Sequence, residues 1–524
     1  MIRGVARLQS HREDLLAELG LGNPMMKTEP LMKSDPEETE DGFKRGMGLF
    51  DSVMVVVGVM IGSGIFIVSA EMSREIGSAG WLLVAWLLTG FLTLAGALSY
   101  AELAAMMPRA GGMYVYLRNA FSPIAGFLYG WTFFTVIQTG SIAAVAIAFT
   151  RFSGVLFPWI SEEKYLIEPL RLSTRYAVSL SRAQLLAIGL IVILTWTNSR
   201  GLKYGKIVQN TFTVSKTVAL IALILLGVSL GWNAPAVQDN LAHAWTARGV
   251  DPIAPGVAAT TAFGLLAALC VAQTGSLFAA DSWHDVTFIA GEVKNPRRTL
   301  PLALGIGAAI VIGLYLLANV AYLVTLPLSE IQHAPADRVG TAAMQKIFPG
   351  IGSALMAAAI MVSTIGTVNA LTLTGARACY AMAKDRLFFR GAAQLNAARV
   401  PARALWIQGV WAVILALPRT FDPGTGQYGN LYNNLLDYII SATLIFYVLT
   451  IIGIFRLRVT KPDAVRPYRA IGYPWLPILY IVGASVVMVM LFAYRPTTTW
   501  PGLVIVALGI PVYAWISRRA GKPA

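Results

Sequence analysis

The sequence predicts an all-α membrane protein with twelve transmembrane helices, two of which are broken near their middle. The first observation is composition: 56% of the 524 residues are hydrophobic, only 13% are charged, and the mean hydropathy is +0.63. The second is a series of apolar runs close to the roughly 20 residues that span a bilayer. The third is that two of these runs contain glycine and polar residues at bilayer depth.

The apolar runs give the number and direction of the helices. We predict spans near residues 50–76, 80–106, 120–150, 183–198, 207–231, 257–290, 300–326, 350–382, 402–418, 431–455, 475–494 and 499–517. Cytoplasmic loops are rich in Lys and Arg, and the connection after every even-numbered span is basic, as in Lys294, Arg297 and Arg298. We therefore expect a multi-pass protein of the cytoplasmic membrane with both termini in the cytoplasm.

Charge and cysteine content exclude several classes. The formal charge is +14, but the basic residues lie in short segments between apolar runs, so membrane topology explains them better than nucleic acid does. Cys270 and Cys379 lie inside apolar segments and predict no disulfide framework. We see no metal-ligand spacing, no nucleophile and base pair, and no repeated pore loop, so we expect neither an enzyme nor a cofactor nor an ion channel.

The first break is predicted by Gly58-Val59-Met60-Ile61-Gly62-Ser63-Gly64-Ile65-Phe66. A glycine costs about 1 kcal/mol relative to alanine in a helix interior. A helix broken at Gly62, Ser63 and Gly64 exposes backbone groups that must face protein or a polar cavity, and the half-helix that follows offers N–H donors suited to a carboxylate. The alternative is that these small residues only let two helices pack closely.

The second break is predicted by the polar and small residues from Gln273 to Asp285 in the sixth span. Interrupted helices at matching positions of two halves indicate an inverted-repeat transporter with its substrate near the midplane. We expect a flexible tail at 1–48 and a membrane domain at 49–518. Its parts would be a first repeat at 49–231, an inverted second repeat at 257–455 and two peripheral helices at 475–518, with a short tail at 519–524.

Four blocks together resemble the amino acid–polyamine–organocation superfamily, most closely its L-type, sodium-independent amino acid exchangers. The blocks are Gly62–Phe66, Ser99–Tyr116, Gly205–Lys216 and Gly291–Pro301, with a weaker match at Arg466–Pro474. The resemblance covers roughly residues 46–518 and implies a LeuT-type fold of two inverted five-helix repeats. It also implies an amino acid substrate whose carboxylate binds backbone N–H groups of Ser63, Gly64 and Ile65.

The same resemblance places the rest of the substrate site. The substrate's ammonium group would face carbonyl oxygens near Ile61 in the first break and near Phe278, Ala279 or Asp281 in the second. Ala280 departs from the family, which often has an aromatic residue there, so the pocket would be wider or closed differently. Phe278 and Trp283 are candidate gates over the substrate, although aromatic core packing explains them as well.

Two intramembrane charges stand out. Lys216 lies well inside the fifth span, where a charge usually has a partner or a function. The family places a lysine here where sodium-coupled relatives hold a cation, which implies contacts with the first break and with Ser363 and Thr364 of the eighth helix. Asp281 could read a cationic substrate group, but a carboxylate there equally suits a cap for the half-helix that begins at Ser282.

We expect a transporter of amino acids, most simply neutral ones, that works by alternating access and exchange. Lys216 could be a fixed cation, which favours exchange, or it could titrate, which favours proton coupling. A proton-coupled amino acid or polyamine symporter, indicated by Lys216 and Asp281, is therefore the first alternative, and it makes protons a possible partner besides the substrate and the lipid bilayer. A membrane sensor that binds an amino acid without moving it is the alternative from another class. Binding to nucleic acid is not expected.

Overall fold

The computed structural model describes residues 45–109, 111–201, 205–388, 390–396, 400–421, 423 and 426–520. Side chains at 205–210, 390 and 519–520 are outside this description. Residues 46–524 form one unit by their contacts, and the account below concerns this unit. Nearly all of the predicted tail at 1–48 and the last four residues lie outside the described part.

Within that part, nine helical segments are long and apolar enough to cross a membrane. They are α4 (Ala79–Met106), α6 (Pro123–Thr132) continued through η2 (Phe133–Ile137) into α7 (Gln138–Leu156), α9 (Gly205–Ser229), α11 (Ala262–Ala279) with η3 (Trp283–Glu292), α12 (Pro296–Thr325), α15 (Gly352–Lys384), α17 (Leu431–Thr460), α18 (Trp475–Tyr494) and α19 (Pro496–Ala520). The helical class is confirmed, and a helix overlaps each predicted span. The count of twelve crossings stays a prediction.

The remaining helices are shorter. Two of them, α2 (Leu49–Met60) and α16 (Ala402–Leu415), are apolar, and α8 (Arg182–Ser199) fills the predicted fourth span. The others are η1 (Gly64–Phe66), α3 (Val68–Ile76), α5 (Met113–Ala120), α10 (Ala234–Ala242), α13 (Leu328–Gln332), η4 (Pro335–Asp337), α14 (Val339–Ile347) and η5 (Arg390–Ala393).

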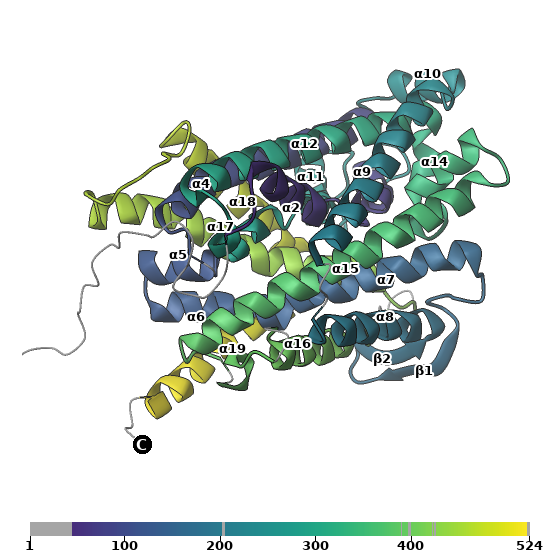
Figure 1. The fold of residues 1–524 in the computed structure, drawn as a ribbon. Coiled ribbons are helices and arrows are strands. Elements are labelled where there is room, and N and C mark those ends of the chain that lie inside the picture. The colour runs from purple at the N-terminus through teal and green to yellow at the C-terminus, as the bar shows by residue number, and fades with distance from the viewer. Residues whose placement is uncertain are drawn as a thin grey trace, which may run out of the picture. The chain divides into compact units, whose positions relative to one another are not determined.

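A small antiparallel sheet was not predicted. Strands β1 (Tyr165–Arg171), β2 (Tyr176–Ser181) and β3 (Pro418–Thr420) are arranged in that order, with Leu170 opposite Val178 and Tyr176 opposite Thr420. The sheet joins the connection before α8 to the connection before α17, and β2 contacts α8 (Figure 1). The class is therefore helical with a minor sheet in two loops.

The long helices surround the two broken segments. In Figure 1, α12 lies alongside α4 and α2, and α15 lies alongside α7, as their contacts also show. The broken segments contact each other in opposite halves, because α2 packs against η3 while α3 packs against α11. The two breaks are thereby brought to the same depth of the bundle, where they face the middle of α12 and α15.

Candidate functional site

The first helix is interrupted where its glycines predict. α2 ends at Met60, Ile61 is extended with φ −71° and ψ 95°, and a short 3-10 turn begins at Gly64. Helix resumes only at Val68. The backbone therefore leaves the α-helical path over seven residues, 61–67, in a part of the chain that is almost fully buried.

The interruption leaves backbone donors open. The N–H of Ile61 still bonds to the Val57 oxygen at 3.0 Å, and the N–H of Phe66 bonds to the Ser63 oxygen at 3.1 Å. Between them, the N–H groups of Ser63, Gly64 and Ile65 donate to no acceptor among the described residues. Because buried N–H groups are nearly always paired, these three donors mark a place built for a ligand or water.

The second break follows the sixth predicted span. α11 ends at Ala279, Ala280 bonds back to the Ser276 oxygen at 3.0 Å, and Ser282 takes a left-handed φ of 66° before η3 begins at Trp283. A left-handed conformation at a residue other than glycine costs energy and often marks a functional site. Ser282, the residue before η3, makes no side-chain cap, and the Asp281 carboxylate accepts hydrogen bonds from the Tyr447 hydroxyl and the Ser282 backbone N–H. Whether Asp281 caps the half-helix or binds a substrate group stays a prediction.

The two breaks touch each other closely. A Cβ atom added at Gly64 would lie 2.7 Å from the Cβ of Ala279, well inside contact distance. The hydroxyl of Tyr315 on α12 lies 2.9 Å from the Met60 oxygen and 3.0 Å from the Ala279 oxygen. Glycine is thus required at position 64 for close approach, and one tyrosine holds carbonyl groups of both breaks. The close-packing interpretation is correct here, and it accompanies the open donors rather than replacing them.

A buried cavity lies between the breaks, α7 and α15. It is lined by Val59, Met60, Gly62, Ser63, Gly64, Ser141, Val145, Phe278, Ala279, Asp281, Ser282, Thr367 and Leu371. It leaves about 20 Å³ for the centre of a water molecule, enough for one or two waters. An amino acid needs more room, so this conformation is closed.

Six of the predicted substrate residues line this cavity: Gly62, Ser63, Gly64, Phe278, Ala279 and Asp281. Ile61 and Ile65 are fully buried beside it without lining it. The residues that the sequence did not single out come from α7 and α15, chiefly Ser141 and Thr367. A lone serine or threonine in a membrane helix has no distinctive pattern, so no sequence signal could have found them.

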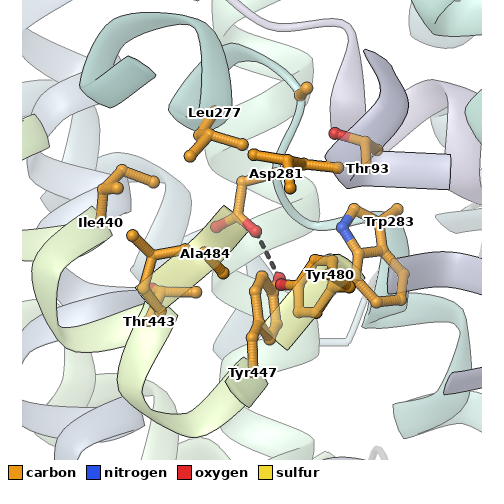
Figure 2. A pocket seen from close by; sticks show the side chains of 12 residues that line it. Thr93, Leu277, Asp281, Trp283, Ile440, Thr443, Tyr447, Tyr480 and Ala484 are labelled. Atoms are coloured by element: carbon orange, nitrogen blue, oxygen red, sulfur yellow. Dashed lines mark hydrogen bonds between the residues drawn. The ribbon is translucent and has the colours of Figure 1, made fainter. Parts of the chain in front are cut away.

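Ala280 faces a second small cavity, shown in Figure 2. Its walls are Leu92, Thr93, Leu277, Ala280, Asp281, Trp283, Ile440, Thr443, Leu444, Tyr447, Tyr480 and Ala484. Asp281 belongs to both cavities. Its carboxylate points toward Tyr447 of α17, whose hydroxyl donates to it (Figure 2). Tyr447 is a site residue that the sequence analysis missed.

The two gate candidates lie in different surroundings. Phe278 is half-buried, lines the first cavity and meets the ring of Tyr432 edge-on at 6.0 Å. Trp283 is 3% exposed and packs against Tyr100 at 5.2 Å and Tyr447 at 5.3 Å. The core-packing interpretation therefore fits Trp283, whereas Phe278 lies in the wall of the first cavity and its gating role stays a prediction.

Lys216 reaches the first break. Its side chain is 2% exposed, and Nζ donates to the Gly58 oxygen near the end of α2 and to the Thr367 hydroxyl at 3.0 Å. The cation thus lies at the carbonyl end of a half-helix, where the dipole favours positive charge. The contact with the first break is as the resemblance implies.

The partner on α15 differs from the predicted pair. Thr364 donates to carbonyl oxygens of its own helix, the nearer at 2.9 Å, and the Ser363 hydroxyl has no partner within the described residues. The contact falls on Thr367, one helical turn after Ser363, because residues four apart share a face. The structure therefore shows a contact one turn from Ser363, and the roles of Ser363 and Thr364 stay a prediction.

Ion pairs close the bundle at both ends. At one end Glu102, 1% exposed, accepts from Arg458 at 2.6 and 3.0 Å and from the backbone N–H of Ala470 at 2.7 Å. At the other end Arg74 pairs with Asp337 at 2.8 Å and Arg151 with Glu162 at 2.7 Å. In the described residues no group of three or more His, Cys, Asp or Glu side chains is arranged to hold a metal ion.

Comparison with known proteins gives a consistent result. The family profile described as amino acid permease matches residues 47–515. The serine/threonine exchanger SteT of Bacillus subtilis (strain 168) is 30% identical over 482 residues, which are 92% of this chain and 99% of that protein. The b(0,+)-type amino acid transporter 1 of Mus musculus is 28% identical over 84% of this chain and 81% of its own length. The large neutral amino acids transporter small subunit 2 of Homo sapiens is 29% identical over 90% and 80%.

Proposed function

Because the chain belongs to the amino acid permease family, we propose that it exchanges amino acids, chiefly neutral ones, across the cytoplasmic membrane without sodium. Its relatives are amino acid transporters that span the membrane several times, and they are not enzymes. The observation that carries the proposal is the row of open N–H donors at Ser63, Gly64 and Ile65, beside a buried cavity.

The donors suit the one group that all amino acids share. A carboxylate accepts several hydrogen bonds and is stabilised at the start of a helix, and α3 begins just after these donors. The ammonium group would lie among carbonyl oxygens of Ile61, Phe278, Ala279 and Asp281. The substrate side chain would then extend toward Phe278 and Ala280, where the second cavity lies.

Specificity for neutral amino acids is supported by the relatives and by the residues that line the second cavity. Two of the relatives are named for neutral substrates, serine and threonine in one case and large neutral amino acids in the other. The second cavity is lined mainly by apolar and hydroxyl side chains. Within it, Asp281 is the one carboxylate of the described lining, and Tyr447 already binds it.

Lys216 supports independence from sodium. Its ammonium group lies on the Gly58 oxygen and the Thr367 hydroxyl, groups that could otherwise help to hold a cation. We propose that it acts as a fixed cation that holds the first break against α15. Ser363, whose buried hydroxyl has no partner within the described residues, would belong to the same cation-site region, and Thr364 would support it from the next position.

We also propose the finer architecture: twelve crossings, a LeuT-type pair of inverted five-helix repeats at 49–231 and 257–455, peripheral helices at 475–518 and both termini in the cytoplasm. The opposed contacts of α2 with η3 and of α3 with α11 support the inverted relation. Movement of Phe278, against a packed Trp283, would gate the cavity.

The test is uptake into proteoliposomes of tritiated L-serine, L-leucine or L-lysine, with interiors either loaded with unlabelled amino acid or empty. We expect uptake of the two neutral substrates only into loaded vesicles, and equal rates in sodium and choline buffers. Uptake no faster than in protein-free liposomes for all three would contradict the proposal. Uptake into empty vesicles driven by an acidic exterior would instead favour proton symport over exchange.

A further inference from the structure

A second polar cluster lies directly beside the substrate cavity. Asp281, His284 and Asp285 of the second break and Tyr447 of α17 are between 1% and 7% exposed. His284 Nδ1 lies 2.9 Å from the Tyr447 hydroxyl, which also donates to Asp281. His284 Nε2 lies 3.8 Å from a carboxylate oxygen of Asp285. Four groups that can gain or lose a proton thus form a continuous row.

The charges of this row do not balance. Among the described residues neither carboxylate is paired with a lysine or arginine, and the other partner of Asp285 is the neutral hydroxyl of Thr374 at 3.3 Å. Two ionised carboxylates without a cation are strongly disfavoured inside an apolar bundle. The cluster therefore has to hold at least one proton, or meet a positive charge, during part of its working cycle.

The neighbours of the row supply no charge of their own. Among the described residues, the titratable side chains next to the row are tyrosines, while Arg377 of α15 is paired with Glu292 of η3 at 3.1 Å. The tyrosines are Tyr100 on α4, Tyr116 on α5, Tyr129 on α6 and Tyr480 on α18, with the neutral Thr374 on α15 and Gln138 on α7 behind Asp285. Lys216 bonds elsewhere, to Gly58 and Thr367.

The hydrogen-bond geometry allows two proton arrangements. A tyrosine hydroxyl has one hydrogen, so when Tyr447 donates to an ionised Asp281, it accepts from Nδ1–H of His284. When Asp281 is protonated, it donates to Tyr447, and Tyr447 donates to a bare Nδ1. Figure 2 shows the Tyr447 hydroxyl at the Asp281 carboxylate, and the same hydroxyl lies 2.9 Å from His284 Nδ1. The same heavy atoms serve both arrangements.

We propose that Asp281, Tyr447 and His284 form a proton relay that couples amino acid exchange to proton movement. In one step, Asp281 gives its proton to the Tyr447 oxygen while Tyr447 gives its own to His284 Nδ1. Asp281 becomes a carboxylate, Tyr447 stays neutral, and His284, whose Nε2 already carries hydrogen, becomes an imidazolium ion. Asp285 stabilises that cation from 3.8 Å. The inference rests on the proposed transport function and deepens it.

Position gives the relay its connection to transport. Asp281 lines both cavities, so a proton can reach it whenever either cavity opens to water. His284 and Asp285 belong to η3, on the opposite side of the break from α11. A movement of η3 against α17 would separate His284 from Tyr447 and trap the proton on one side.

The test compares two buried tyrosines next to the row. Tyr447→Phe removes the bridging hydroxyl, whereas Tyr129→Phe removes a hydroxyl that has no hydrogen-bond partner among the described residues. Proteoliposomes loaded with unlabelled amino acid and a pH dye, with tritiated L-serine, L-leucine or L-lysine outside, report protons and substrate together. We expect the ratio of protons to substrate to fall about tenfold or more in Tyr447→Phe, as for loss of a positioned proton-transfer group, and to stay at the wild-type value in Tyr129→Phe.

A second variant and the wild-type protein provide two further tests of the relay. His284→Gln is expected to lower the same ratio, and because substrate flux is its denominator, a partial loss of folded protein cancels. Wild-type substrate uptake without any proton movement between pH 5 and 8 would overturn the relay and leave the transport function intact. So would an unchanged ratio in both Tyr447→Phe and His284→Gln. Absence of uptake in the wild type would contradict the transport function, and the relay with it.

Discussion

The two breaks present different chemical groups, backbone N–H donors in the first and polar side chains in the second. The first break consists of glycine, serine and backbone, and its free groups are N–H donors at positions 63 to 65. The second break carries side chains, with Asp281 bound by Tyr447 and His284 next to it. A backbone site recognises what all amino acids share, whereas a side-chain site can change one residue at a time. The comparison suggests that the first break sets the class of substrate and the second sets its identity and coupling.

The largest expected effect comes from Gly64→Ala. The added Cβ would lie 2.7 Å from that of Ala279, and displacing reacting or binding groups by about 1 Å can cost roughly a hundredfold in rate. We expect exchange to fall by about that factor. Gly62→Ala is the control, because its new Cβ would meet Thr367 at an ordinary 3.7 Å. The exchange rates of both variants are measured in proteoliposomes made from purified, monodisperse protein. Equal rates for the two variants would contradict the proposed role of the first break.

A smaller loss is expected from Lys216→Met, which removes the cation from the carbonyl end of α2. The Gly58 oxygen and Thr367 hydroxyl lose a buried donor, at a cost of about 1–3 kcal/mol. Exchange should therefore fall about tenfold or more. Thr217→Val is the control, since that hydroxyl follows Lys216 in the chain and donates to the Thr213 oxygen of its own helix. An exchange rate in Lys216→Met equal to that of the control would show that the lysine is dispensable for holding the break.

The smallest effect on rate, and the sharpest on selectivity, is expected from Ala280→Tyr. The new ring would fill the cavity between Leu277, Thr443 and Tyr480. Hydrophobic pockets discriminate by about 1–3 kcal/mol per methylene, so uptake of L-leucine should fall several-fold relative to L-serine. Competition between the two substrates measures this directly. An equal fall in the uptake of L-leucine and L-serine would show that the second cavity does not discriminate between substrate side chains.

The helices were predictable because lipid imposes a simple rule on sequence. Apolar length sets each span, and the ends of α4, α15 and α18 fall within two residues of the prediction. The breaks were also predictable, because three glycines and a serine have little place inside a membrane helix. Both features depend on local composition alone.

What escaped prediction depends on contacts between distant segments. Tyr447 lies 166 residues from its partner Asp281, and nothing in its own helix sets it apart from other buried tyrosines. Thr367 lies one turn from the predicted Ser363, because packing sets which turn of α15 lies against the first break. The sheet escaped because its strands pair across two loops far apart in sequence, with β3 only three residues long.

Tyr315 stands between the two breaks with one hydrogen for two carbonyl oxygens, those of Met60 and Ala279. While the breaks touch, the hydroxyl serves both acceptors. If the breaks separated, the Tyr315 hydroxyl could stay bonded to the oxygen of either Met60 or Ala279. The other oxygen would then lose only its share of a hydrogen bond that both oxygens had accepted. In the proposed alternating access, this shared bond would lower the enthalpic cost of separating the two breaks.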